Sequence, residues 1–139
     1  GLEKIKTIGD SYMAVCGAPI PVANHAERAA LFALDVAEFM KNYQTDIGDK
    51  VSIRIGLHTG NVVAGIIGEN KFAYDMWGDA VNTASRMESH GEAGKIHVSE
   101  EFKHAVETVH EPSLRFIPRG EMEIKGKGKM KTYFLEKYL

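Results

Sequence analysis

The sequence predicts a single α+β domain, residues 1–139, in which strands paired as hairpins alternate with amphipathic helices. Three observations support this class. Two strand patterns meet at the tight turn Ile8-Gly9-Asp10-Ser11, a long helical pattern covers residues 24–43, and residues 114–139 form two strand patterns around a lysine-glycine turn. We expect mainly antiparallel pairing, because short turns join antiparallel neighbours.

Composition and charge limit the classes of function. The 139 residues suffice for one core, and 44% hydrophobic with 26% charged residues is ordinary for a globular domain. A formal net charge of -2 gives no general attraction to nucleic acid or to an acidic membrane, so we expect neither as a direct partner. The single cysteine, Cys16, excludes an intrachain disulfide and suits a cytoplasmic setting. Because the chain opens inside a strand pattern, we expect an N-terminally incomplete domain that lacks its first elements.

The first hairpin, residues 3–17, contains a candidate metal ligand. Gly9 permits the backbone conformation of a two-residue turn, which leaves the carboxylate of Asp10 facing outward, where a hard cation can reach it. Lys6 lies four residues earlier and leans to the same side of the extended chain. Gly-Asp is also ordinary turn chemistry, so the alternative is that Asp10 only completes the turn.

A long scaffold helix is predicted over residues 24–43, after a loop at 17–21 that contains two prolines. Asn24 is a plausible N-cap, and Glu27 stands three residues later, as in a capping box. Two apolar stripes follow the helical repeat and predict packing across a sheet: Ala26, Ala30, Ala33, Ala37 and Met40, with Phe32, Val36, Phe39 and Tyr43 beside them.

The middle of the chain predicts a second hairpin. Residues 51–55 alternate apolar and polar side chains, and a second strand, residues 61–68, follows a turn at 58–61. Gly60 and Gly65 have the glycine spacing of a phosphate-binding loop, but Ile66 stands where that motif needs lysine. The sequence therefore excludes a P-loop NTPase.

A second candidate site lies within residues 74–88, where a helix is predicted from about residue 78 to 89. Asn82 and Arg86 fall one turn apart on one face of this helix, where they either offer donors to a ligand or simply face water. The opposite, buried face is predicted to carry Ala80, Ala84 and Met87.

The C-terminal third predicts a strand at 95–98, a helix at 99–108 capped by Ser99, and the two final strands. Phe102, Ala105 and Val106 are expected to point inward from the helix. Lysines recur at 125, 127, 129 and 131, so that on a strand they would share a face, either as a solvated edge or as a phosphate contact. The histidines lack zinc-ligand spacing, and no serine lies in a nucleophile elbow.

The remaining candidates are the tools of phosphoryl transfer on a nucleotide: an acid for a metal ion, cations for phosphate charge, and polar groups for base and sugar. Residues 3–17 and 74–88, followed by Lys125-Gly126-Lys127-Gly128 and Lys131-Thr132-Tyr133-Phe134, resemble the catalytic domain of the class III adenylate and guanylate cyclases. The resemblance runs over essentially the whole chain.

This resemblance implies a fold, an assembly and a cofactor. The fold is a ferredoxin-like βαββαβ core of the polymerase-palm type with a mainly antiparallel sheet. Family members act as head-to-tail dimers whose active sites lie between two chains, so a homodimer is expected. By the same likeness Asp10 is one of two aspartates that bind Mg²⁺ or Mn²⁺, which activates the ribose 3′ hydroxyl for attack on the α-phosphorus while pyrophosphate leaves.

The resemblance also implies a role for each of five other residues. Lys6 and Asp75 match the residues that read the purine; guanylate cyclases carry glutamate and cysteine there, so the expected substrate is ATP. Asn82 matches the residue that positions the ribose. Arg86 matches the one that stabilises charge on the α-phosphate in the transition state, and Lys125 the lysine that holds the terminal phosphates.

One departure from the family keeps alternatives open. The other metal aspartate of the family lies on an upstream strand, in a pattern like Phe-x-Asp-Ile-x-Gly-Phe-Thr, which does not occur here. The alternatives are therefore a catalytically silent nucleotide-binding or dimerisation module of the same fold, and a guanylate cyclase. A diguanylate cyclase is disfavoured, because Gly9-Asp10 is followed by Ser11 and Tyr12 and not by that family's acid-acid-Phe turn.

Overall fold

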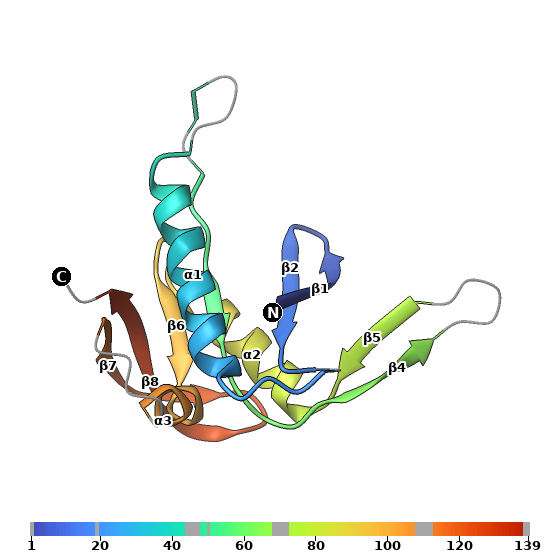
Figure 1. Cartoon of the computed structure of the whole chain (residues 1–139). Helices are drawn as coiled ribbons and strands as arrows, with labels where there is room; N and C mark the ends of the chain where they lie inside the picture. The colour runs from blue at the N-terminus through green and yellow to red at the C-terminus, as the bar shows by residue number, and fades with distance from the viewer. Residues whose placement is uncertain are drawn as a thin grey trace.

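The computed structural model describes residues 2–18, 20–43, 48–49, 51–67, 73–107 and 113–137. These residues form three helices and eight strands, in the mixed order that the sequence predicts for an α+β domain (Figure 1). The elements are β1 (Leu2–Ile8), β2 (Ser11–Cys16), α1 (His25–Lys41), β3 (Ile55–Leu57), β4 (Val63–Ile67), β5 (Ala73–Trp77), α2 (Asp79–Ser89), β6 (Ile96–Ser99), α3 (Glu100–Glu107), β7 (Leu114–Ile124) and β8 (Gly128–Lys137).

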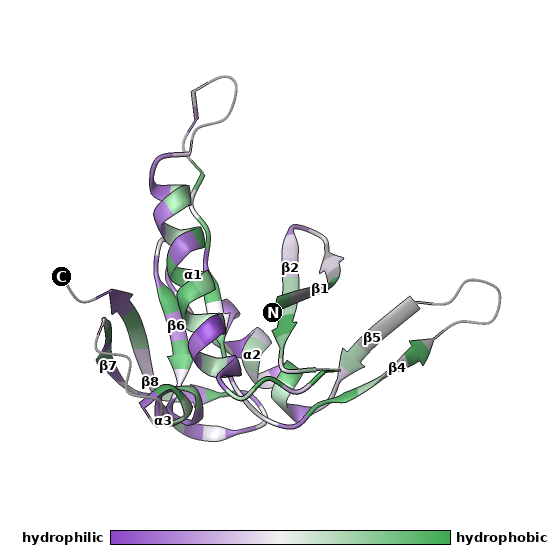
Figure 2. Cartoon of the chain, in the orientation of Figure 1, coloured by the Kyte–Doolittle hydropathy of each residue, from purple (hydrophilic) through white to green (hydrophobic). Residues whose placement is uncertain are grey.

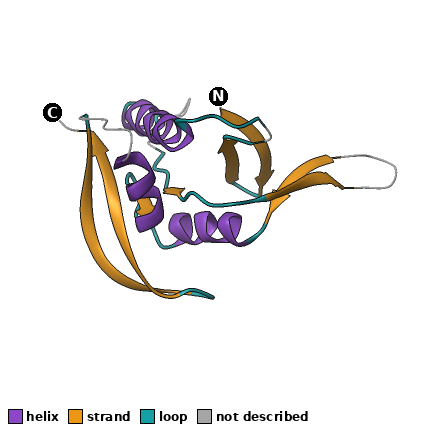
Figure 3. Ribbon diagram, turned by 60° about the horizontal axis from the view of Figure 1, so that its bottom comes forward, coloured by secondary structure: helices purple, strands orange, loops and turns teal. Residues whose placement is uncertain are grey.

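A four-stranded sheet in the order β3-β6-β8-β7 forms the main layer. β3 pairs parallel with β6, whereas β6–β8 and β7–β8 are antiparallel, so antiparallel pairing dominates as expected. β7 and β8 form one long, curved hairpin along the side of the helices (Figure 3). α1 and α3 contact each other and the sheet, and α2 contacts β3 and β6.

The two faces of β6 differ in chemistry because successive side chains of a strand point to opposite faces. Ile96 and Val98 are buried in an apolar cluster with α1 and α3. His97 and Ser99 point to the other face and are equally buried, and His97 Nδ1 donates a hydrogen bond to the carbonyl oxygen of Met87 in α2. The apolar residues of α1 and β6 appear as the green segments of Figure 2. α1 and α3 thus share the apolar core, and α2 sits on a more polar face.

The first predicted stripe of α1 and the predicted inward face of α3 are largely confirmed. Ala26, Ala30 and Ala33 are buried and Ala37 packs against the same cluster. Phe102 and Val106 of α3 are buried as predicted, Ala105 packs against the cluster, and the backbone N–H of Phe102 donates to Ser99 Oγ over 3.2 Å, which confirms the cap. The capping box of α1 is not formed, because the Asn24 side chain makes no capping hydrogen bond. The second stripe of α1 is not core either: Phe32, Phe39 and Tyr43 are exposed.

Two smaller hairpins stand outside the main sheet. β1 and β2 pair antiparallel around the two-residue turn Gly9-Asp10, with Gly9 at φ 59°, which confirms the first predicted hairpin. β4 and β5 pair antiparallel and project as an arm (Figure 1). The arm carries exposed apolar side chains at Val63, Ile66 and Trp77.

The predicted hairpin between residues 51–55 and 61–68 is wrong. The regular strand begins only at Ile55, and its partner is β6, some forty residues further on. β4 pairs instead with β5, a strand that the sequence reading placed in no element of its own. Local alternation fixes which residues can form a strand, but parallel pairing needs a long crossover, and nothing local to the strand specifies it.

Among the helices that the structure describes, none combines the length and the apolar character needed to span a bilayer.

Candidate active site

α2 carries the predicted Asn/Arg pair on an accessible face. It begins directly after Gly78, whose φ of 123° favours glycine, and the Asn82 N–H closes the first turn on the Gly78 carbonyl over 3.1 Å. Asn82 is exposed and Arg86 is half-buried. The predicted buried face is only partly right: Met87 is buried, but its fully buried companion is Thr83, while Ala80 and Ala84 are half-buried.

Arg86 is the most distinctive side chain on this face. Its Nε is buried and has no hydrogen-bond partner among the residues that the structure describes. A buried guanidinium N–H without a partner is costly, and planar guanidinium donors match phosphate oxygens in pairs. The side chain is therefore suited to an anionic group from outside this chain.

One hydrogen bond within α2 and two contacts with the sheet position this helix. The Thr83 hydroxyl donates to the Asp79 carbonyl over 2.9 Å, which satisfies a buried polar group within the helix. His97 Nδ1 lies 2.8 Å from the carbonyl oxygen of Met87. Gly56 of β3 lies directly against the helix backbone at Glu88. These contacts hold α2 on the sheet with Thr83 and Met87 buried, and they leave Asn82 exposed and Arg86 half-buried.

The lysine-glycine turn between β7 and β8 meets the start of α2. Lys127 forms an ion pair with Asp79, the first residue of the helix. Lys125 is exposed two residues earlier. The prediction that the lysines share one strand face is wrong for Lys125 and Lys127, which lie in the turn, because Gly126 and Gly128 adopt positive φ values and reverse the chain there. The sequence thus predicted the position of this turn, and the structure shows that the turn contacts α2.

Lys6 and Asp75 lie on strands that approach each other. Lys6 pairs with Met13 in the first hairpin, after an irregularity in register between Lys4 and Lys6. Asp75 pairs with Gly65 in the arm. β1 and β5 are in contact, so the backbones of the two predicted purine-reading residues belong to adjacent elements. Their side chains fall outside the described part of the structure, so their joint action stays a prediction.

Asp10 lies in the turn of the first hairpin and is exposed. In Figure 1 this turn lies at the end of the hairpin remote from α2. Among the described residues, no three histidine, cysteine, aspartate or glutamate side chains gather where they could hold a metal ion. Asp10 is a suitable hard oxygen ligand, but it supplies one carboxylate, so further ligands must come from elsewhere.

A histidine that the sequence reading did not single out lies behind the start of α2. The His58 side chain is only 7% exposed, and its Nδ1 lies 2.6 Å from Ser99 Oγ and 3.7 Å from Glu101 Oε2. Burial lowers the pKa of His58, Glu101 and Asp79 oppose that shift, and Lys127 adds to it. A single histidine after a strand carries no periodic signal, so only the tertiary structure reveals this junction.

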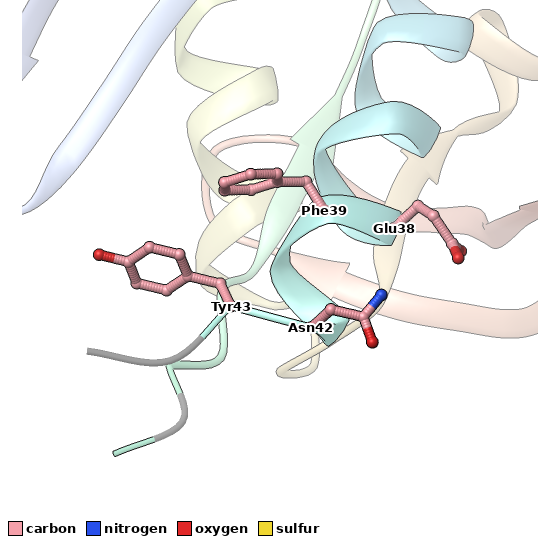
Figure 4. Close-up of a pocket in the computed structure, with 4 residues that line it drawn as sticks. All are labelled: Glu38, Phe39, Asn42 and Tyr43. Carbon is pink, nitrogen blue, oxygen red and sulfur yellow. The ribbon is translucent and has the colours of Figure 1, made fainter. Parts of the chain in front are cut away.

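A shallow hollow at the C-terminal end of α1 includes none of the predicted site residues. It is lined by Glu38, Phe39, Asn42 and Tyr43, and the rings of Phe39 and Tyr43 lie 5.8 Å apart (Figure 4). Glu38 gives it no cationic character, so it does not suit a triphosphate.

The fold is that of nucleotide cyclase catalytic domains. Over 99% of this chain and 74% of the other, the structure superposes on the guanylate cyclase domain of RhGC from Catenaria anguillulae in complex with GTP, with a TM-score of 0.91 at 43% identity. The family described as the adenylate and guanylate cyclase catalytic domain matches residues 1–137. The chain therefore belongs to this family.

Curated relatives of both kinds are similar to this chain. The guanylate cyclase soluble subunit beta-2 of Rattus norvegicus is 47% identical over 133 residues, which is 95% of this chain and 19% of the relative. An adenylate cyclase of Mycobacterium tuberculosis is 47% identical over 135 residues, 97% of this chain and 30% of the relative. The chain thus spans less than a third of the curated relatives that it matches, and the family alone leaves adenine and guanine nucleotides as substrates.

Proposed function

We propose that this chain is the catalytic domain of an adenylate cyclase, which converts ATP to 3′,5′-cyclic AMP and pyrophosphate in cyclic nucleotide signalling. The observation that carries the proposal is the accessible face of α2, where Asn82 is exposed and Arg86 has a buried Nε without a protein partner in the described part of the chain. Membership of the cyclase family supplies the reaction class.

The choice of ATP rests on Lys6 and Asp75. The lysine ammonium donates to N1 of adenine, and the carboxylate of Asp75 accepts from the exocyclic amine. Guanine presents a donor at N1, which would meet the donor of Lys6, and an oxygen acceptor at C6, which would meet the acceptor of Asp75. Neither pair can form a hydrogen bond. Contact between β1 and β5 supports a shared role for the two residues. A guanylate cyclase is the second candidate, because relatives of that kind are equally similar.

The chain's own residues divide the work on the nucleotide. The Asn82 amide holds the ribose so that its 3′ hydroxyl faces the α-phosphorus. Arg86 donates to the α-phosphate oxygens, and this interaction strengthens as negative charge builds up in the transition state. Lys125 holds the terminal phosphates, which leave as pyrophosphate. Positioning and electrostatic stabilisation of this kind are the principal means by which proteins catalyse phosphoryl transfer.

Asp10 is the residue of this chain that would hold Mg²⁺ or Mn²⁺, the ions that cyclase domains of this family generally use. An exposed carboxylate at a turn fits such a hard cation, although it provides one ligand of the several required. When bound, the metal would lower the pKa of the ribose 3′ hydroxyl and neutralise phosphate charge. We propose that the second carboxylate of the metal site is not among the 139 residues of this chain.

A head-to-tail homodimer completes the proposed site. In Figure 1 the turn between β1 and β2 lies at the end of its hairpin remote from α2, so in this proposal a second copy brings its metal ligand to the nucleotide that α2 holds. The β4–β5 arm offers exposed Val63, Ile66 and Trp77 for such an interface. The domain would work in the cytoplasm, where its nucleotide substrate is available.

The full-length protein should be incubated with ATP or GTP and Mn²⁺ or Mg²⁺, and both cyclic nucleotides quantified by chromatography. We expect cyclic AMP to exceed cyclic GMP by at least about tenfold, the discrimination that one mispaired polar contact gives. An excess of cyclic GMP would assign the protein as a guanylate cyclase. Binding of ATP without any cyclic product would leave the silent nucleotide-binding module, which the joint retention of Lys6, Asp10, Asp75, Asn82 and Arg86 argues against.

A further inference from the structure

The ion pair between Lys127 and Asp79 joins two parts of the chain that are 48 residues apart. Lys127 belongs to the turn between β7 and β8, and Asp79 is the first residue of α2. The carboxylate is favourably placed at a helix N-terminus, where the backbone dipole attracts negative charge. Figure 3 shows the end of the long hairpin curling past α2.

The same hairpin holds the other end of α2. Arg119 of β7 donates from Nη1 to the carbonyl of His90, the residue that caps α2 at its C-terminus, and lies 3.9 Å from Glu92. A cation at a helix C-terminus is favourable for the reverse reason. Two basic residues of the β7–β8 hairpin thus bind the two ends of the helix that carries Asn82 and Arg86.

Residues before β4 also pack against the start of α2. These contacts hold the helix in place, so that the turn can bind to a fixed position. Gly60 approaches so closely that an added Cβ would lie 2.9 Å from the Cβ of Ala80. His58 is buried beside the same junction and is bonded to Ser99. The Asp79 side chain is 73% exposed and the Lys127 side chain is 31% exposed. The ion pair therefore lies on the solvent side of the contact between the β7–β8 turn and α2.

The ion pair of Lys127 with Asp79 also restricts the position of Lys125. One residue, Gly126, separates them, so their Cα atoms are at most about 7 Å apart. Gly126 and Gly128 have positive φ values of 81° and 75°, a conformation that glycine adopts without strain and that gives the turn no rigidity of its own. The position of Lys125 therefore depends on what holds its neighbour.

We propose that the Asp79–Lys127 ion pair is a positioning contact, which holds the β7–β8 turn against α2 so that Lys125 meets the terminal phosphates of the nucleotide whose α-phosphate Arg86 contacts. The inference rests on the proposed function of this site. Neither Asp79 nor Lys127 touches the nucleotide in this arrangement. Asp79 is three residues before Asn82 and seven before Arg86, so all three lie on the same side of α2. A turn held at Asp79 therefore lies on the side of the helix that carries Asn82 and Arg86.

Breaking the pair should weaken nucleotide binding without unfolding the domain. In the full-length protein we expect Asp79→Asn and Lys127→Met each to raise the KM for the preferred nucleotide about tenfold, which corresponds to the loss of one charge-assisted hydrogen bond. Turnover at saturation should change less than about threefold, and the melting temperature should move by no more than a few degrees, because exposed ion pairs stabilise folded proteins little. The double variant Asp79→Asn/Lys127→Met should lose no more than either single variant.

The matched control is Lys129→Met, which removes the same charge from an exposed position on β8 close to the turn. An equal rise in KM for Lys129→Met would show a general electrostatic attraction and would overturn the positioning role. Additive losses in the double variant would overturn it too, because Lys127 and Asp79 would then act separately.

Amide hydrogen exchange provides a readout that does not depend on turnover. The turn amides at 125–128 should exchange faster in Asp79→Asn than in wild type or Lys129→Met. Faster exchange with an unchanged KM would overturn the inference while the proposed cyclase function stands. A wild-type protein that neither binds nor converts nucleotide would overturn both, so the two failures are distinguishable.

Discussion

Gly56 of β3 lies against the backbone of Glu88 in α2, so closely that an added Cβ would be 2.1 Å from the Glu88 nitrogen. The same Cβ would lie 2.6 Å from the carbonyl carbon of Met87. Because backbone atoms cannot move aside as the end of a flexible side chain can, any larger residue must push the helix away from the sheet. The positions of Asn82 and Arg86 therefore depend on a glycine that lies 26 and 30 residues before them in the sequence.

We expect Gly56→Ala to reduce the free energy of unfolding by about 2 kcal/mol or more, within the range for overpacking in a core. Urea unfolding followed by circular dichroism measures the change. The matched control is Gly65→Ala, whose added Cβ would meet the end of the Trp77 ring at 3.3 Å, and that ring is 44% exposed and can move. Equal effects of the two substitutions would show that close packing of α2 on β3 is not the cause.

Arg86→Ala should reduce turnover far more than it raises KM. The guanidinium is proposed to gain strength as charge builds up on the α-phosphate, so its loss acts mainly on the transition state. We expect kcat to fall about 100-fold or more, as for other single donors to a developing oxyanion, with KM changing less than about threefold. The control is Arg115→Ala, since Arg115 is paired with Glu136 at 2.7 Å on the β7–β8 hairpin. Equal losses in kcat and affinity would make Arg86 an anchor for the bound ground state.

The double substitution Lys6→Glu/Asp75→Cys should shift preference from ATP toward GTP. A glutamate accepts from N1 and the exocyclic amine of guanine, and removing the Asp75 carboxylate takes away an acceptor that would face the guanine O6. The measurement is the ratio of kcat/KM for the two nucleotides, and we expect it to change by at least about 100-fold, the discrimination of two polar contacts. A double variant that remains active and keeps the wild-type ratio would contradict the assignment of these residues to the purine.

The stability of the domain should decrease as the pH falls below about 6.5, the ordinary pKa of histidine. Burial lowers the pKa of His58, and burial likewise lowers that of His97, although its hydrogen bond to Met87 opposes the shift. Between each lowered pKa and 6.5 the unfolded chain binds more protons than the folded protein. The free energy of unfolding therefore rises with pH across that window, and it decreases when the pH is lowered through the same window.

His58→Gln should remove part of this dependence, because glutamine can still bond to Ser99 but takes up no proton. The measurement is the free energy of unfolding in urea at pH 7.5 and at pH 5.5, compared between wild type and variant. The control is His104→Gln, since the His104 side chain is 67% exposed and its partner Glu100 lies 3.7 Å away. An unchanged pH dependence in His58→Gln would show that His58 keeps its proton equilibrium on folding.

Elements governed by short-range patterns could be predicted from the sequence. The turn at Gly9-Asp10, the burial of Ala26, Ala30 and Ala33, and the cap of α3 by Ser99 follow from glycine conformation, helical repeat and hydroxyl capping. The capping box at Asn24 failed because a favourable residue type permits a cap without requiring its hydrogen bond.

The sequence by itself determined the residue types of the candidate site and the helix that carries Asn82 and Arg86, because 3.6-residue periodicity and motif spacing are local properties. Only the tertiary structure decided that β3 pairs with β6, that β4 pairs with β5, and that Lys127 meets Asp79. Those contacts join residues far apart along the chain, and their partners are selected by the packing of whole elements around a common core, which no local pattern encodes.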